Sequence, residues 1–336
     1  MSDPTRKVRW GVLSTARIGI EKVIPALQAS RYGDVRAIAS RNPDSARAAA
    51  SALGIATAHG SYEALLVDRD IDAIYIPLPN HMHVPWTVRA IEAGKHVLCE
   101  KPIALDANQA RALVDATRSR PDLKVMEAFM YRFHPQWQAA KARVADGGLG
   151  ELRAIQSWFS YFNDDPDNIR NHAAIGGGAL MDIGCYNVSL SRFLFGAEPL
   201  RVMATMDRDP RFGVDRLTAG VLQFEAGTSA FTCSTQAAPY QRMLAVGTTG
   251  RLEIEIPFNA PPDRACTAWL HDGSGAETLT FDACDQYTLQ GDAFARAVLD
   301  DTLAPTPLDD AVANMAVIDA LVHSAESGRW ESPTAS

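Results

Sequence analysis

The sequence has 336 residues, enough for two domains, and its 47% apolar and 21% charged residues are typical of a globular protein. A formal net charge of −8, with the basic residues scattered, argues against nucleic acids and anionic membranes as partners. We expect neither a signal peptide nor a membrane span, because no suitable apolar run is present. The five cysteines are widely spaced without a CxxC pair, which favours reduced thiols in a cytoplasmic protein.

The first 125 residues alternate short apolar runs with helical patterns. Short strands without polar alternation are typical of a parallel sheet buried on both faces, and the intervening helices imply right-handed crossovers. The pattern therefore predicts a doubly wound α/β domain over residues 1–125. Its expected elements in chain order are strand Val8–Leu13, helix Ile18–Ala29, strand Val35–Ala39, helix Ser45–Leu53, strand Ile71–Ile76, helix Val84–Ala93, strand His96–Cys99, a helix that Asp106 caps and that runs to Arg118, and the short apolar segment Lys124–Met126.

The second part of the chain, residues 126–336, has a different pattern. After a helix at Pro135–Ala145 come strand-like runs separated by turn signals, which favours an α+β domain with a large, mainly antiparallel open sheet. We expect three helices to cover one face of this sheet. The predicted strands are Glu151–Phe162, Leu200–Met206, Leu217–Phe224, Ser229–Thr235, Arg242–Val246 and Arg251–Ile256, and the predicted helices are Leu180–Leu194, Tyr287–Asp300 and Asp309–Ser327.

The turn after the first strand is a weakened dinucleotide fingerprint. In the register of G-x-G-x-x-G, the three glycine positions fall on Ser14, Ala16 and Gly19. Glycine normally permits the tight turn and lets backbone N–H groups approach a pyrophosphate. A plain strand-to-helix turn therefore stays an alternative, although the position after the first strand suits a cofactor. The candidates for cofactor contact in this turn are Ser14, Thr15, Ala16, Arg17 and Ile18.

The end of the second strand indicates which nicotinamide cofactor is used. NAD-specific enzymes place a carboxylate there to bind the ribose 2′-hydroxyl, but this sequence has Ser40 and Arg41. A guanidinium and a hydroxyl suit a 2′-phosphate, because arginine donates parallel, charge-assisted hydrogen bonds. We predict NADP, the alternative being that Arg41 is a solvated loop residue.

Two further motifs carry a family resemblance. They are Pro79-Asn80-His81-Met82-His83 and Glu100-Lys101-Pro102, which follow later strands of the same domain. With the N-terminal turn they resemble the family of glucose–fructose oxidoreductase and inositol dehydrogenase (Gfo/Idh/MocA), and the resemblance extends over nearly the whole chain. It implies an NADP-binding Rossmann domain followed by a substrate-binding and oligomerisation domain.

The resemblance also implies roles for individual residues. Lys101 would reach the reacting carbon, next to a cis Lys101–Pro102 peptide bond. The alternative is a surface lysine before proline. His81 and His83 lack a third partner for a metal ion, so we expect no metal site. The residues implied in cofactor binding by these motifs and the segment after them are Pro79, Asn80, His83, Glu100, Lys101 and Arg132.

The second domain contains the run Gly176-Gly177-Gly178 and, after it, Asp182 and Tyr186. The last two residues are four apart, so they share one face of a helix, and the glycines suggest close approach of backbone. A tyrosine four residues after the aspartate resembles one branch of the family, which contains glucose–fructose oxidoreductase, aldose–aldose oxidoreductase, xylose dehydrogenase and dihydrodiol dehydrogenase. We expect Tyr186 to be the general acid/base, Lys101 to lower its pKa, and Asp182 to orient the substrate. A half-buried helix aromatic is the alternative for Tyr186.

These residues predict an NADP(H)-dependent oxidoreductase of aldoses, which oxidises C1 or reduces a sugar carbonyl. A dehydrogenase of non-sugar diols and a non-catalytic NADP-sensing regulator are the alternatives. NADP is either exchanged or held tightly. Substrate contacts are expected from Lys101, Asp182, Tyr186 and, as the weakest candidate, Phe162, while Glu127 and His134 are equally explained as structural residues. The family implies a homodimer or tetramer formed through the open face of the second sheet.

Overall fold

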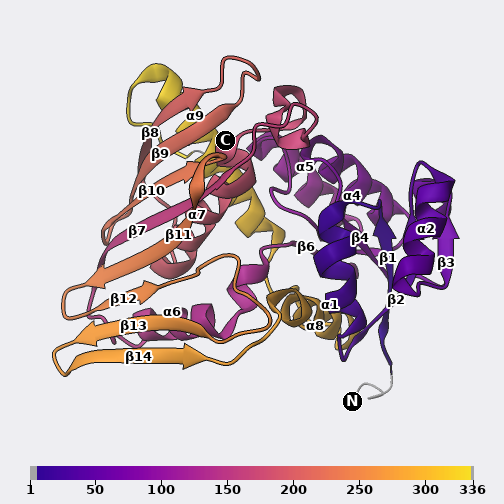
Figure 1. Ribbon diagram of the computed structural model, residues 1–336, viewed down its shortest axis with the longest axis horizontal. Coiled ribbons are helices and arrows are strands. Elements are labelled where there is room, and N and C mark those ends of the chain that lie inside the picture. Colours follow the sequence, from indigo (N-terminus) through magenta and orange to yellow (C-terminus); the bar gives the residue numbers. More distant parts are fainter. Residues whose placement is uncertain (1–5, 334–336) are drawn as a thin grey trace. The chain divides into compact units, whose positions relative to one another are not determined.

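The computed structural model describes residues 6–333 (Figure 1). The chain divides into two compact units. The first contains the chain up to Met130 together with Gln286–Ala311, and the second contains Tyr131–Asp285 together with the chain from Val312. This division by packing differs from the predicted domain limit after residue 125, which stays a prediction about independent domains.

The first unit contains a parallel sheet of six strands in the order β3-β2-β1-β4-β5-β6. This confirms the doubly wound Rossmann-type architecture, and the central strands are buried as the apolar runs require. The strands are β1 (Val8–Leu13), β2 (Gly33–Ala39), β3 (Thr57–His59), β4 (Ala73–Ile76), β5 (His96–Cys99) and β6 (Val125–Glu127). The helices between them are α1 (Ile24–Gln28), α2 (Pro43–Leu53), α3 (Tyr62–Leu66), α4 (His83–Glu92) and α5 (Ala107–Arg118).

Helix α8 (Gln286–Leu299) corrects one expectation, because it packs in the first unit and not on the second sheet. The ring of Phe294 lies against that of Trp10, with centroids 5.4 Å apart. Thr288 Oγ1 donates to the carbonyl of Ala26 at 3.1 Å. Gly291 makes the approach possible, since a Cβ there would come within 2.5 Å of Leu27 Cδ2. An amphipathic helix suits either sheet, so its own sequence does not identify its partner.

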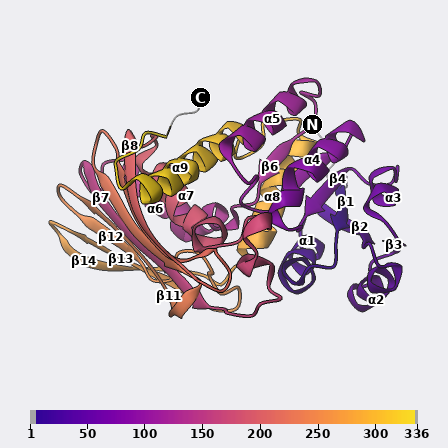
Figure 2. The same ribbon diagram turned by 90° about the horizontal axis from the view of Figure 1, so that it is seen from above.

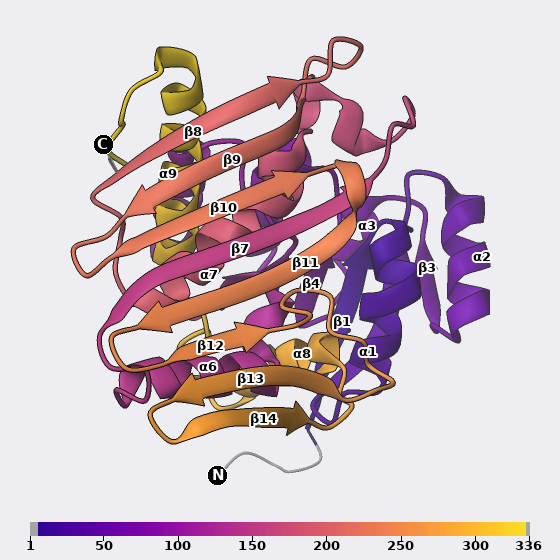
Figure 3. The ribbon, with the colours of Figure 1, turned by 60° about the vertical axis from the view of Figure 1, so that its left-hand side comes forward.

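The second unit contains a sheet of eight strands in the order β14-β13-β12-β11-β7-β10-β9-β8 (Figure 3). Only the central pair β7 and β10 is parallel, so the predicted mainly antiparallel sheet is confirmed. The strands are β7 (Leu152–Phe162), β8 (Arg201–Arg208), β9 (Asp215–Gln223), β10 (Thr228–Ser234), β11 (Gln236–Gly247), β12 (Arg251–Ile254), β13 (Cys266–Asp272) and β14 (Gly275–Phe281).

Helices cover one face of this sheet and leave the other open (Figure 2). The covering helices are α6 (Pro135–Ala145), α7 (Cys185–Phe195) and the part of α9 (Leu308–Ser327) from Val312. Asn187 on α7 donates to Ser157 Oγ of β7 at 2.8 Å, so odd-numbered residues of this strand face the helices. Trp158 lies on the opposite face and is 37% exposed. Across residues 6–333, no helix is long and apolar enough to cross a membrane.

Candidate functional site

The turn after β1 has the backbone form of a dinucleotide turn although it lacks the first glycine. Ser14 has a φ of 96°, in the left-handed region that favours glycine. Its hydroxyl donates to the carbonyl of Pro77 at 3.1 Å and accepts from the Ala16 N–H at 3.2 Å. The Ser14 hydroxyl thus compensates locally for an unfavourable φ. Its hydrogen is engaged within the fold, and phosphate binding by this turn stays a proposal.

A π-helical turn, Gly19–Val23, opens the helix that follows. Such turns occur frequently at functional sites. Thr15, Ala16 and Ile18 are half-buried in front of it. Arg17 is exposed and its Nε lies 2.8 Å from Glu21 Oε1, so its guanidinium is paired along the helix surface.

At the end of β2, Ser40 is buried and Arg41 is exposed. The guanidinium of Arg41 lies beside the phenol of Tyr62, where its charge opposes the rise in the Tyr62 pKa that burial causes. The side chain of Asn42 caps helix α2 by accepting from the Asp44 N–H at 2.9 Å. The strand therefore ends in an exposed cation with no acidic residue at the position where an NAD enzyme would have one.

The motif at residues 79–83, which follows β4, contacts the backbone of neighbouring segments through the ring of His83. Its Nδ1 and Nε2 lie 2.7 Å from the carbonyl oxygens of Pro102 and Leu78, and burial lowers its pKa to about 4. The ring is therefore neutral at physiological pH and donates to one of these two carbonyls, and contact of His83 with a cofactor stays a prediction. Pro79 and Asn80 are half-buried and precede it in a single 3₁₀ turn.

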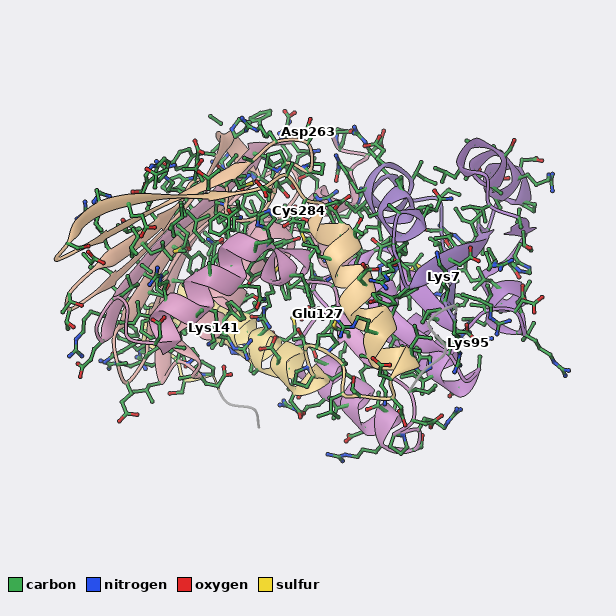
Figure 4. The ribbon with its side chains drawn as sticks, turned by 90° about the horizontal axis from the view of Figure 1, so that it is seen from below. Lys7, Lys95, Glu127, Lys141, Asp263 and Cys284 are labelled. Carbon is green, nitrogen blue, oxygen red and sulfur yellow. The ribbon has the colours of Figure 1, made fainter. Side chains whose placement is uncertain are left out.

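The segment after β5 places Lys101 at the carboxyl end of the parallel sheet, where ligands bind in such folds. The peptide bond between Lys101 and Pro102 is cis, as expected. Glu100 Oε1 accepts from the hydroxyl of the buried Tyr75 at 2.7 Å. Glu127, labelled in Figure 4, accepts from the Ile103 N–H at 2.7 Å and so ties β6 to the same segment. Among residues 6–333, no cluster of three or more His, Cys, Asp or Glu side chains could hold a metal ion.

In the second unit, Asp182 is held by two side chains that the sequence did not single out. The Tyr161 hydroxyl donates to Asp182 Oδ2 at 2.5 Å, and Arg170 Nε lies 3.0 Å from the same oxygen. Tyr161 is on the helix-covered face of β7, so alternation places the neighbouring Phe162 on the opposite face, where it is 61% exposed. The structure therefore brings Tyr161 to Asp182 and directs Phe162 away from it.

Tyr186 lies in the first turn of helix α7 and is only 6% exposed. Its ring centroid lies 5.4 Å from that of Phe258, 5.7 Å from that of Phe159 and 5.8 Å from that of Tyr131. A second π-helical turn, Leu180–Gly184, precedes it and carries Asp182, where a regular helix was expected. The phenol is therefore fixed by aromatic packing at the start of a helix.

Two residues near the start of the second unit, Arg132 and His134, have roles in packing. Arg132 Nη2 donates to Ser189 Oγ at 2.8 Å, one turn after Tyr186, and its guanidinium lies over the ring of Phe193. His134 is fully buried and caps helix α6 through Nδ1, which accepts from the Gln136 N–H. Burial lowers the pKa of His134 to about 4, so it is neutral at physiological pH. Contact of Arg132 with a cofactor stays a prediction.

The run Gly176-Gly177-Gly178 allows two close backbone approaches. A Cβ on Gly177 would lie 2.4 Å from the carbonyl oxygen of Arg170, and one on Gly178, whose φ is 116°, would lie 2.0 Å from Asp215 Oδ1. Asp215 is buried, and its Oδ2 accepts from the Leu180 N–H at 2.8 Å and from Thr218 Oγ1 at 2.6 Å. The glycines thus serve the packing of this helix start, and Asp215 anchors it.

Asp215 gives a prediction for stability against pH. Loss of hydration raises its pKa to about 6. A carboxyl whose pKa is higher in the folded protein stabilises the fold fully below its unfolded pKa of about 4, and this contribution is lost as the pH rises through about 6. Asp215→Asn keeps an oxygen for Leu180 and Thr218 but cannot titrate. Between pH 4 and 7, urea unfolding should show the native protein losing on the order of 2–3 kcal/mol relative to this variant. Parallel stability curves would refute the raised pKa.

Most of the chain matches two family descriptions. Residues 8–129 match the family description "Oxidoreductase family, NAD-binding Rossmann fold", and residues 137–253 match "GFO/IDH/MocA C-terminal domain". The chain is 42% identical to D-xylose 1-dehydrogenase (NADP(+)) 2 of Haloferax volcanii, over 95% of this chain and 98% of that protein.

Two solved structures are similar over almost their full length. A 3-ketoreductase from Actinomadura kijaniata, in complex with NADP and TDP-benzene, has a TM-score of 0.88 and 32% identity, covering 95% of this chain and 98% of that one. The aldose–aldose oxidoreductase from Caulobacter crescentus, complexed with glycerol, has a TM-score of 0.90 and 27% identity, covering 97% of this chain and 100% of that one.

Proposed function

The chain belongs to the Gfo/Idh/MocA family of nicotinamide-dependent oxidoreductases, and from this premise we propose that it is an NADP(H)-dependent oxidoreductase of aldose sugars. The reaction is oxidation at C1, or reduction of a sugar carbonyl. The observation that carries the proposal is a buried phenol, Tyr186, fixed on the helix that also carries the ion-paired carboxylate of Asp182. The similarity to a D-xylose dehydrogenase supports an aldose as substrate.

In the proposed mechanism the proton and the hydride leave the sugar by different routes. Tyr186, as phenolate, takes the proton from the C1 hydroxyl, while NADP supplies the hydride acceptor when it is bound. A free tyrosine has a pKa of about 10, so the phenolate needs a nearby cation at neutral pH. Lys101 is the proposed cation, and Asp182 orients the sugar as a hydrogen-bond acceptor. Lys101 belongs to the first unit and Tyr186 to the second, so their pairing is part of the proposal.

A cavity of about 480 Å³ in the second unit suits a small polar substrate. Its lining combines aromatic rings with hydrogen-bonding side chains, as sugar recognition requires. It shares Tyr161 with the cluster around Asp182. The lining residues are Phe159, Ser160, Tyr161, Pro239, Tyr240, Gln241, Arg242, Glu255, Ile256 and Asn259.

The residues at the cofactor end of the first unit fit NADP. The left-handed backbone at Ser14 provides the tight turn that a dinucleotide needs, and the exposed Arg41 guanidinium suits a 2′-phosphate. In this proposal Ser14, Thr15, Ala16, Ile18, Ser40 and Arg41 hold the adenosine and phosphate groups. Pro79, Asn80, Glu100 and Lys101 line the nicotinamide end.

Arg41→Ala should raise the KM for NADP by about 10- to 100-fold, the loss expected for a hydrogen-bonded charge, and change the KM for NAD little. The measurement is initial rate against each cofactor with a saturating sugar. Arg36→Ala is a matched control, because Arg36 is exposed on the same strand and pairs with Asp34. Equal effects of Arg41→Ala on both cofactors would refute the phosphate role.

The substrate is tested by near-ultraviolet absorbance of the purified protein before and after addition of xylose or glucose. A band of reduced nicotinamide without added NADP would support an aldose oxidoreductase that retains its cofactor. A band that needs added NADP would support an ordinary dehydrogenase. No band in either case would overturn the aldose proposal, and non-sugar diols and sugar ketones would be tested next.

The open face of the second sheet is the proposed surface for a homodimer. One cross-strand row on it contains five apolar residues, interrupted by Gln156 and Glu253; the apolar residues are Met203, Val221, Ala230, Leu244 and Trp269. Packing two such faces together would remove this row from water in both copies. Light scattering of the purified protein reports the oligomeric state, and a monomer would refute this part of the proposal.

A further inference from the structure

Arg170 is a half-exposed arginine attached to a nearly buried carboxylate. It lies in a 3₁₀ turn, Ile169–Asn171, on the segment between β7 and α7. Its side chain is 42% exposed, whereas that of Asp182 is 13% exposed, and Nε lies 3.0 Å from Asp182 Oδ2. The guanidinium of Arg170 therefore contacts both solvent and the carboxylate of Asp182, which the proposed mechanism uses.

The backbone of Arg170 is held in place from two sides. Asn171 is buried, and its Nδ2 donates to Asn163 Oδ1 at 3.1 Å and to the carbonyl of Asp165 at 2.8 Å. The Gly178 N–H donates to the Arg170 carbonyl at 2.8 Å, and Gly177 leaves space for that carbonyl. This segment thus presents Arg170 in one defined position.

The charges around Tyr186 explain what a cation in this position does. The ionised Asp182 on the same helix disfavours a phenolate, because like charges raise the pKa of an acid. The negative charge of Asp182 is the main cause that raises the pKa of Arg170, and the phenol of Tyr186 contributes in the same sense. Other titratable or charged side chains near Tyr186 or Asp182 within this unit include Tyr131, Tyr161 and Arg132, the last of which donates to Ser189.

We propose that Arg170 is a positioning residue of the reaction, which stabilises the phenolate form of Tyr186 and holds the carboxylate of Asp182 in place. This inference rests on the proposed function. The cation comes from the same unit as Tyr186, so it acts whether or not Lys101 is close. Without Arg170, Tyr186 would lie beside a carboxylate that has lost this positive charge.

The test compares Arg170→Met and Arg170→Lys in sugar oxidation with NADP. In Arg170→Met the limb on which kcat rises with pH should move up by about one pH unit, and kcat at pH 7 should fall about tenfold, since a nearby charge shifts a pKa by about 1–3. Arg170→Lys should restore part of the shift. The KM for NADP should not change. Arg211→Met is the control, because Arg211 is a partly exposed arginine of the same unit that pairs with Asp209 and Asp164.

A second measurement does not depend on turnover. The ultraviolet titration of the protein minus that of its Tyr186→Phe form isolates the phenolate of Tyr186. Replacing Arg170 by Met in both proteins should move this difference titration to higher pH, while thermal unfolding verifies that each variant is folded. An unmoved titration, with Lys no better than Met, would overturn the role of Arg170. Full activity of Tyr186→Phe would instead overturn the proposed function itself.

Discussion

Phenylalanine in place of Tyr186 should lower kcat for sugar oxidation by about 10²–10⁴-fold, the usual contribution of a positioned acid/base group. The substitution removes one oxygen and leaves the ring, so the packing against Tyr131, Phe159 and Phe258 is retained. Thermal stability and NADP affinity should therefore change little. The measurement is steady-state oxidation of xylose with NADP, together with a fluorescence titration of the cofactor.

Tyr32→Phe is the matched control for this prediction. Tyr32 is a half-buried tyrosine of the first unit outside the proposed site, so loss of its hydroxyl should leave turnover within about twofold and stability within about 0.5 kcal/mol. Turnover by Tyr186→Phe at the level of this control would contradict the assignment of Tyr186. A loss of kcat together with a lower melting temperature would assign the hydroxyl to packing.

Helices and strands of this fold were predictable where neighbouring residues alone indicate both their type and their ends. Strands β1 and β5 and helix α6 have the predicted bounds, because buried apolar runs and a proline at the first helical turn determine them. Asp106 caps α5 as predicted, accepting from the Gln109 N–H at 2.8 Å. Four elements were missed, namely β3, α3, β13 and β14, and two of them, β3 and β14, are edge strands. In β14 most side chains are exposed, so its sequence has no apolar alternation that would identify a strand.

In the candidate site, too, contacts between residues close in sequence could be predicted, whereas contacts between distant residues could not. The spacing of Asp182 and Tyr186 identified a helix start that the structure contains. By contrast, Arg170 and Asp215 reach this helix from segments 12 and 35 residues away from their partners. No sequence pattern links them, although the three consecutive glycines were a sign of close packing there. Cofactor contact by Ser14 stays a prediction, and the sequence did not indicate that its hydroxyl would also stabilise a left-handed backbone.

Lys101→Met should lower kcat by about 10²–10³-fold, the loss typical of removing one charged or hydrogen-bonding group from the transition state. The segment around Lys101 is anchored independently of its side chain, because Tyr75 holds Glu100 and His83 holds Pro102. The variant should therefore fold normally and bind NADP. Lys101→Arg should restore little, since a planar guanidinium does not replace a compact ammonium. Lys22→Met, at an exposed lysine of the same unit, is the control.

The double variant Lys101→Met, Tyr186→Phe tests whether the two residues act together, which is the step that joins the two units in the proposed mechanism. If Lys101 works by stabilising the phenolate of Tyr186, its removal costs nothing further once the phenol is gone. The double variant should then be about as slow as the slower single variant, because residues that act as a unit are non-additive. Effects that multiply would mean that Lys101 and Tyr186 contribute independently. In that case the ionisation of Tyr186 would depend on the positive charge of Arg170 and not on that of Lys101.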